Sequence, residues 1–308
     1  MPRAIQFPST HGTAPAVRPH EEISEFPDRF PRLVGTGAMV LGPREQLRLY
    51  RVDCGGNCHC VQSTQDEYEI IEFAFPDDVI GFKYPLPCLA KAIARGGVSP
   101  IRIVAMGSSS TAGRADVVPF PYWLEMYLRA HFHDRNIDLR IDVLNRGIGG
   151  QEADKEFDRF DTDIFALAPV LVIWQVGTNA VFHRQDYDIN VIAAKIEAGL
   201  KQLHAKSAEM DVMLLDPQYV TAMLLDDKAE LSERMVKLIS DKAELFGVNV
   251  FHRWALMRHW HVLNNISFER MLDPTDTDKL HQSDASTQRL SRGLCDTILK
   301  AATASHAT

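Results

Sequence analysis

From residue 101 onward, short apolar runs alternate with longer segments in which apolar residues recur every three or four positions. The short runs predict five strands, at residues 101–106, 139–144, 170–174, 212–215 and 248–251. The longer segments predict helices at residues 119–133, 152–167, 189–206, 227–246 and 285–302, with Asp284 able to cap the last one. Strands that alternate with helices in this way predict a parallel sheet covered by helices on both faces.

The first hundred residues follow a different pattern. Residues 1–34 are rich in Pro, His, Ser and Thr without periodicity, which predicts a flexible leader. Between residues 47 and 82, alternating and β-branched runs favour strands, so residues 35–98 are interpreted as a small β-rich module with a linker. The boundary is placed near Val98, and residues 99–308 form the predicted catalytic domain. The expected fold class is therefore a three-layer α/β/α domain with a five-stranded parallel sheet and a small N-terminal β module.

Four polar clusters follow predicted strands or precede the last helix. They are Gly107 to Gly113 (Gly-Ser-Ser-Ser-Thr-Ala-Gly), Asn145 to Gly150 (Asn-Arg-Gly-Ile-Gly-Gly), Gly177 to Asn179 (Gly-Thr-Asn) and Asp278 to His281 (Asp-Lys-Leu-His). Ligands of open α/β sheets bind beyond the carboxyl ends of the strands. The four clusters are therefore expected to meet at one edge of the sheet.

This set of clusters resembles the SGNH (GDSL-type) hydrolases, which carry a Ser, a Gly, an Asn and a His in four separated blocks. The resemblance covers about residues 99–308 and implies a flavodoxin-like fold and an esterase activity. It implies Ser109 as the nucleophile, Gly150 and Asn179 as oxyanion donors, and Asp278 with His281 as the Asp-x-x-His pair. Ser108 departs from the family pattern, because an Asp usually precedes the nucleophile.

The chemistry of ester cleavage makes the same demands of these residues. A serine hydroxyl becomes a good nucleophile when a neutral imidazole takes its proton, and a carboxylate then orients the imidazole. Asp278 lies three residues before His281, close enough to act across one turn. The backbone N–H groups of Ser109 and Gly150 and the Asn179 amide are the expected donors to the oxyanion. Taken singly, each cluster is more simply explained as a turn or a cap, and their joint order favours the hydrolase.

Two alternatives stay open at this point. Ser108 or Ser110 could replace Ser109 as the nucleophile. The chain could also be a regulatory or binding protein with an inactive hydrolase-like domain. A nucleotide-binding domain is disfavoured, because the Gly107 to Gly113 turn lacks the Lys of a P-loop. Trp254 and Trp260 are suggested to line a substrate pocket.

The N-terminal module suggests two further interpretations. Residues 47–82 partly resemble the cyclic-nucleotide-binding β-roll of the Crp/Fnr regulators, but the phosphate-binding segment of that family is absent, so nucleotide binding is not carried over. Cys54, Cys58 and Cys60, together with His59, could suggest a metal site, although their spacing is not a standard one. A structural role is favoured for these cysteines, and neither a metal nor a cofactor is predicted.

Composition limits the classes of partner. A formal net charge of −8 disfavours nucleic acid, and no apolar run approaches the length of a membrane-spanning helix. The absence of a signal-like N-terminus and the five scattered cysteines predict a cytoplasmic protein. The expected partner is a small-molecule ester or an acylated carbohydrate or lipid. The sequence leaves open the natural substrate, the choice between hydrolysis and acyl transfer, and the oligomeric state.

Overall fold

The computed structural model describes residues 73–97, 99–114, 116–206 and 208–304, together with the backbone of three N-terminal strands. The chain divides into two compact units, Met1–Glu69 and Ile70–Thr308. In the first unit, β1 (Ala38–Val40), β2 (Leu49–Val52) and β3 (Cys58–Val61) form an antiparallel sheet in that order. The predicted leader over residues 1–34 lies outside the described residues, as do the side chains of Cys54, Cys58 and Cys60.

The second unit is built on a five-stranded sheet in which every neighbouring pair is parallel. The strands are β4 (Ile101–Gly107), β5 (Ile141–Gly147), β6 (Leu171–Gln175), β7 (Asp211–Leu215) and β8 (Asn249–Phe251). Their order is β5-β4-β6-β7-β8, which is the flavodoxin-like arrangement. The predicted α/β fold with a five-stranded parallel sheet is confirmed.

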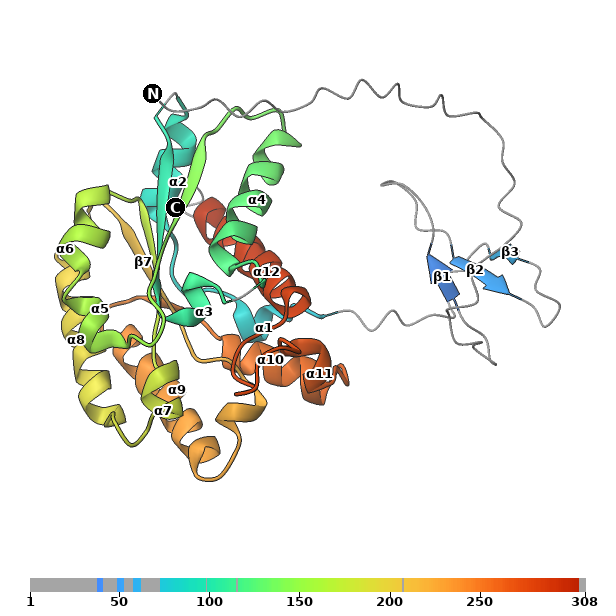
Figure 1. Cartoon of the computed structure of the whole chain (residues 1–308). Coiled ribbons are helices and arrows are strands. Elements are labelled where there is room, and N and C mark those ends of the chain that lie inside the picture. Colours follow the sequence, from blue (N-terminus) through green and yellow to red (C-terminus); the bar gives the residue numbers. More distant parts are fainter. Residues whose placement is uncertain are drawn as a thin grey trace, which may run out of the picture. The chain divides into compact units, whose positions relative to one another are not determined.

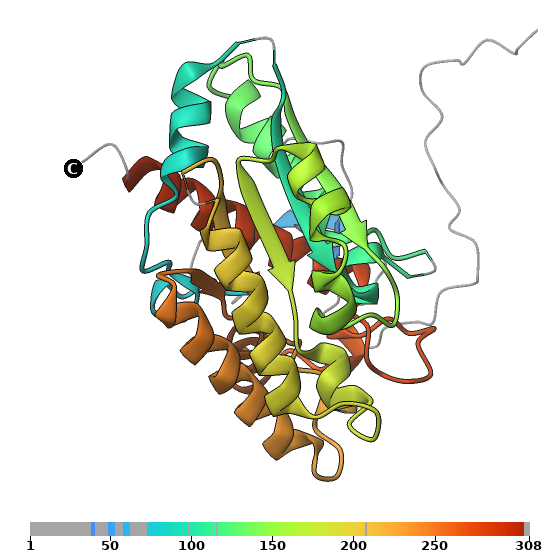
Figure 2. The same cartoon turned by 90° about the vertical axis from the view of Figure 1, so that its left-hand side faces the viewer.

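Helices cover both faces of this sheet (Figures 1 and 2). On one face, α2 (Pro87–Arg95) and α4 (Phe120–His133) pack against α12 (Asp284–Ala304). On the other face, α8 (Ile189–His204) packs between α5 (Ala153–Phe157) and α9 (Lys228–Leu245). The other α-helices of the described residues are α1 (Asp77–Ile80), α3 (Ser109–Ala112), α6 (Phe160–Asp163), α7 (Thr178–Phe182), α10 (Arg253–Val262) and α11 (Phe268–Met271).

The single helix predicted over residues 152–167 is wrong. The segment breaks into α5, α6 and a 3₁₀ turn at Phe165–Leu167. The breaks let Phe160 become fully buried edge-on against the Trp174 ring, with ring centroids 5.0 Å apart. Aromatic packing on the sheet therefore prevails over the helical spacing of the segment.

The domain boundary expected near Val98 is also wrong, because residues 73–97 belong to the second unit. Phe73, Leu86 and Leu89 are buried in its core. The Asp211 carboxylate, at the start of β7, accepts hydrogen bonds from the backbone N–H groups of Cys88 (3.2 Å) and Leu89 (2.8 Å). These contacts fix the beginning of α2 to the sheet, so the segment is part of the core and not a linker.

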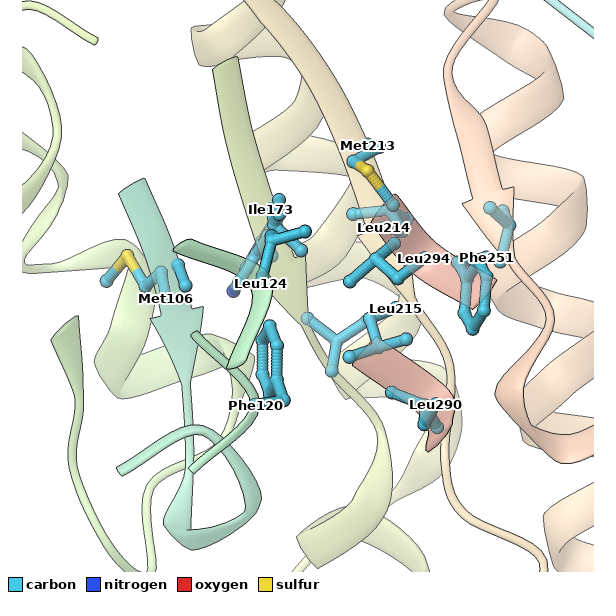
Figure 3. Packing of buried hydrophobic residues seen from close by; sticks show 14 of the residues in the cluster. Met106, Phe120, Leu124, Ile173, Met213, Leu214, Leu215, Phe251, Leu290 and Leu294 are labelled. Atoms are coloured by element: carbon cyan, nitrogen blue, oxygen red, sulfur yellow. The ribbon is translucent and has the colours of Figure 1, made fainter. Parts of the chain in front are cut away.

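The core fills the space between the sheet and the helices on each face. Figure 3 shows Phe120 and Leu124 of α4 and Leu290 and Leu294 of α12 lying against strand residues such as Leu215. This packing holds α4 and α12 in place beside the carboxyl end of β4, where the candidate site begins. Among the described residues, no helix is long and apolar enough to cross a membrane.

Candidate active site

Ser109 is the first residue of α3 and follows directly on the turn after β4. Its Oγ lies 2.9 Å from Nε2 of His281. The two neighbouring serines point elsewhere. Ser108 is only 2% exposed and donates to Oε1 of Gln175 from its backbone N–H (3.1 Å) and its hydroxyl (3.0 Å), whereas Ser110 accepts from Gln218 (3.2 Å). Of the three serines, Ser109 is the one whose hydroxyl lies within hydrogen-bond distance of the His281 imidazole.

Two glycines next to the turn that carries Ser109, one at the end of β4 and one at the end of β5, leave no room for a side chain. A Cβ at Gly107 would lie 2.4 Å from Oγ1 of Thr111, and one at Gly147 would lie 2.2 Å from the backbone N of Ala112. Glycine therefore permits the loop after β5 to pack directly against α3. A Cβ at Gly149 would lie 3.8 Å from Cβ of Ser109, which places this loop beside the serine.

His281 lies in the loop between α11 and α12, and its carboxylate partner is Asp276. Oδ2 of Asp276 is 2.8 Å from Nδ1 of His281, and the Asp276 side chain is fully buried. The prediction that Asp278 orients the imidazole is wrong for this structure. Asp278 is exposed, and its backbone N–H donates to Oδ1 of Asp276 (3.1 Å). The loop turns back at Lys279, which has φ of +56°. This bend brings Asp276, which is further from His281 in sequence than Asp278, next to the imidazole ring.

Backbone groups and an arginine hold the Asp276 carboxylate. Oδ2 accepts hydrogen bonds from the backbone N–H groups of Leu280 (2.9 Å) and His281 (2.7 Å), and Oδ1 pairs with Arg114. Burial alone would raise the pKa of Asp276, but the hydrogen bonds from the backbone and ring of His281 and from Leu280 outweigh it. The pKa of this carboxyl therefore lies well below its usual range, and Asp276 is ionised at neutral pH.

The predicted oxyanion donors lie on the loops after β5 and β6. Gly150 has φ of +77°, a conformation that favours glycine. Asn179 is buried in α7, and its Nδ2 donates to the backbone O of Gln151 at 2.7 Å. This bond ties the Asn179 amide to the residue that follows Gly150 and leaves its second N–H available. The structure therefore joins these two predicted donors in one assembly, and their role toward an oxyanion stays a prediction.

Glu152 is a buried residue that sequence reasoning did not single out beyond its place at a helix start. Its Oε1 accepts from the backbone N–H groups of Ala153 (2.9 Å) and Gly177 (2.8 Å), and its Oε2 accepts from Ala180 (2.9 Å). Burial raises the pKa of Glu152, although the three backbone donors oppose the shift. Its position next to the Gly-Gly-Gln turn was the available signal. The carboxylate clamps the turn that carries Asn179.

A narrow cavity of about 30 Å³ opens beside the serine and the histidine. Its wall is formed by residues from α3, α4, α10 and α12 and from the loops beside them: Ser109, Ser110, Gly113, Arg114, Val117, Pro119, Phe120, Arg253, His281, Gln282, Thr287 and Leu290. The suggestion that Trp254 and Trp260 line the pocket is wrong. Trp254 packs edge-on against Tyr219, and Trp260 is fully buried with its Nε1 donating to the O of Ala74 at 2.7 Å.

Among the described residues, no group of three or more His, Cys, Asp or Glu side chains is arranged to hold a metal ion. The interpretation of Cys54, Cys58 and Cys60 stays a prediction, because the side chains of these cysteines lie outside the described part of the chain.

The doubly wound fold and the arrangement at its strand ends define an α/β protein of hydrolase architecture. The chain belongs to the Non-GDSL lipase-like family, whose model matches residues 73–304. The family name agrees with the presence of Ser108 where a GDSL motif has Asp. The match begins at Phe73, and the resemblance of residues 47–82 to the Crp/Fnr β-roll finds no support.

Solved structures with a similar fold include variants of one enzyme. An acetyl-xylooligosaccharide esterase variant of Axe2 from Geobacillus stearothermophilus aligns with a TM-score of 0.54 at 19% identity, covering 64% of this chain and 93% of that one. The acetylxylan esterase Axe2 itself aligns with a TM-score of 0.53 at 18% identity and the same coverage. At these identities the likeness shows the shared fold. A search of curated proteins gives no significant match.

Proposed function

We propose that the protein hydrolyses carboxylic esters through an acyl-enzyme formed on Ser109. The observation that carries this proposal is the continuous chain of hydrogen bonds from Oγ of Ser109 to Nε2 of His281 (2.9 Å) and from Nδ1 of His281 to Asp276 (2.8 Å). A nucleophile, a base and an orienting carboxylate in this order are what acyl transfer to serine requires.

Each step follows from the position of these groups. His281 takes the hydroxyl proton as Oγ of Ser109 attacks the ester carbonyl, and Asp276 stabilises the imidazolium that forms. The expected donors to the oxyanion are the backbone N–H groups of Ser109 and Gly150 and the Asn179 amide, as the SGNH resemblance implies. The C–O bond to the alcohol then breaks, and His281 returns its proton to the alcohol. Water, activated by the same imidazole, releases the acid.

The similar structures support this proposal in two respects. Solved variants of Axe2 include substitutions of a serine, a histidine and an aspartate that are described as catalytic mutants. Axe2 is described as an esterase of acetylated xylan or xylooligosaccharides, and the cavity of about 30 Å³ here suits a short acyl group. The proposed substrates are therefore small or acetylated esters, including acylated carbohydrates.

A comparison of two serine variants tests the proposal. Wild-type protein is expected to hydrolyse p-nitrophenyl acetate faster than longer esters and to react covalently with a fluorophosphonate. The Ser109→Ala variant should lose both properties, with kcat falling by about 10⁶-fold or to background. Ser110→Ala is the matched control and should keep both, because its hydroxyl contacts Gln218 and not the imidazole.

Two results would contradict the proposal. Labelling and turnover that persist in Ser109→Ala would move the nucleophile elsewhere. Background rates with every ester in the wild type, with no covalent labelling, would favour a binding protein with an inactive hydrolase-like domain.

A further inference from the structure

A buried arginine, Arg253, is among the residues that line the cavity beside Ser109. Arg253 follows β8 as the first residue of α10 and is only 1% exposed. Its Nε donates to the backbone O of Asp216 at 2.9 Å. Its Nη2 is buried and has no hydrogen-bond partner among the residues that the structure describes. Buried polar groups nearly always have partners, and Arg253 is one of the residues that line the cavity, so the unpaired Nη2 indicates an acceptor that a ligand supplies.

The positive charge of Arg253 also lacks a direct partner. The nearby Asp216 carboxylate is engaged by other groups, because Oδ1 accepts from the backbone N–H of Trp254 (2.9 Å) and Oδ2 lies 3.3 Å from Nδ1 of His252. Within the described part of the chain, no ion pair joins Arg253 to a carboxylate. Burial lowers the pKa of Arg253 to about 10, against the opposing effect of Asp216, so the group is still charged at neutral pH. A buried charge that no carboxylate contacts directly destabilises a fold, which favours a role in binding over a role in stability.

The fold brings Arg253 to the same cavity as the nucleophile. In the sheet, β8 is separated from β4 by β6 and β7, so the two strand ends are ~14 Å apart at the usual strand spacing. Despite this separation of their strands, Arg253 and Ser109 both line the same cavity. At about 30 Å³, the cavity has room for a small polar group such as a carboxylate.

We propose that the site selects small esters that carry a carboxylate, and that the Arg253 guanidinium binds this carboxylate while Ser109 attacks the ester carbonyl. A planar carboxylate matches the fork of N–H donors on arginine, and the narrow cavity disfavours the bulkier phosphate. The inference rests on the proposed function. The bound carboxylate is unchanged by the reaction: only the ester C–O bond breaks, the alcohol leaves with a proton from His281, and water supplies the second acid oxygen.

Two matched pairs of substrates test this selection. Monoethyl malonate and ethyl acetoacetate place an anionic or a neutral group on the acyl side, whereas acetoxyacetate and acetoxyacetone place them on the alcohol side. Hydrolysis is followed in a pH-stat, and each kcat/KM is divided by the rate of alkaline hydrolysis of the same ester. Wild type should prefer the anionic member of one pair by at least about tenfold, an energy difference of about 1.4 kcal/mol. The pair that shows the preference identifies the side of the ester that faces Arg253.

Variants then assign the preference to this residue. Arg253→Met should abolish it, lowering kcat/KM for the anionic ester by at least about tenfold more than for its neutral partner, and Arg253→Lys should retain part of it. Arg258→Met is the matched control, because Arg258 is an exposed arginine of the same helix, and its ratios should equal those of the wild type. If Arg253→Met fails to fold, as circular dichroism would reveal, the wild-type ratios and the Lys variant decide the matter.

Two outcomes would overturn the inference. One is a wild type that treats both members of each pair alike. The other is an Arg253→Met variant that lowers kcat/KM equally for anionic and neutral esters, which would assign the arginine a structural role. Either result differs from failure of the proposed function, in which no ester is hydrolysed, p-nitrophenyl acetate included.

Discussion

Two aspartates near His281 can be distinguished by a pair of isosteric substitutions. Asp276→Asn removes the charge that faces the imidazole and places an amide NH₂ among donors from Arg114, Asp278, Leu280 and His281. Asp278→Asn changes an exposed side chain that has no hydrogen bond or ion pair within the described residues. The sequence spacing predicts Asp278 as the orienting acid and the structure places Asp276 on the imidazole, so the two substitutions distinguish these assignments.

The structure sets the expected magnitudes. In another serine hydrolase, replacing the carboxylate that orients the catalytic histidine lowers kcat by about 10⁴-fold. We expect a decrease of this order for Asp276→Asn. Leaving a buried donor unsatisfied should also lower the free energy of unfolding by about 1–3 kcal/mol. For Asp278→Asn, kcat should stay within about twofold and stability within about 0.5 kcal/mol of the wild type, as for other exposed positions.

The assay is kcat with p-nitrophenyl acetate, together with urea unfolding of each variant. Unfolding data distinguish two causes of a low kcat, which are the loss of the orienting carboxylate and disorder of the loop. An Asp276→Asn variant that is folded and has a low kcat has lost only the orienting carboxylate. A large loss of kcat in Asp278→Asn beside a near-normal Asp276→Asn would refute the assignment. It would show that the loop adopts the Asp-x-x-His arrangement when the enzyme works.

Three further predictions concern the surroundings of the site. Asn179→Ala should lower kcat for p-nitrophenyl acetate by about 10²–10³-fold with little change in KM, because an oxyanion donor stabilises the transition state. An unchanged kcat would show that Asn179 is not an oxyanion donor. Glu152→Gln should replace the carboxylate oxygen that accepts from the Ala180 N–H by an amide donor, which should lower the free energy of unfolding by about 1–3 kcal/mol in urea titrations. A variant as stable as the wild type would show that Glu152 does not hold this turn. The pKa of Asp276 is lowered on folding, so its contribution to stability is full above a pH of about 5 and is lost as the pH falls through the unfolded-state pKa of about 4 and below. The difference in unfolding free energy between wild type and Asp276→Asn should therefore shrink between about pH 5 and pH 3, and a constant difference would contradict this.

Much of the fold was predictable from local pattern. The run of apolar residues in β6 is buried along its whole length, as expected of a central parallel strand. Helix α8 buries the apolar positions Ile192, Ile196, Leu200 and Leu203 that predicted it. Prediction failed where tertiary contacts decide. The segment with α5 and α6 breaks where Phe160 packs against the Trp174 ring. Helix α2 is fixed by the Asp211 carboxylate, more than a hundred residues further along the chain.

The candidate site shows the same division. The strand-end clusters were predictable, because topology brings the carboxyl ends of parallel strands together. The acid was not, because the choice between Asp276 and Asp278 depends on the path of a loop with a positive φ at Lys279. Arg253 was also beyond reach, since a lone arginine after a strand carries no signal of burial until the cavity is seen.

The departure at Ser108 is explained by the hydrogen bonds beneath the site. Oε1 of Gln175 accepts from Ser108 and from Oγ1 of Thr111 (3.3 Å), while its Nε2 donates to Oγ1 of Thr178 at 3.2 Å. Thr178 donates to Gln218 (3.1 Å), whose Nε2 reaches the backbone O of Leu280 (3.1 Å).

This network joins the loops after β4, β6 and β7 to the loop that carries His281. A serine suits its first position, because its hydroxyl donates to the Gln175 oxygen, whereas an Asp would present a buried negative charge to that acceptor. The neutral Ser108 and the Gln175 amide thus form a matched pair. The residue that departs from the GDSL pattern, Ser108, therefore helps to connect the Ser109 turn to the rest of the site.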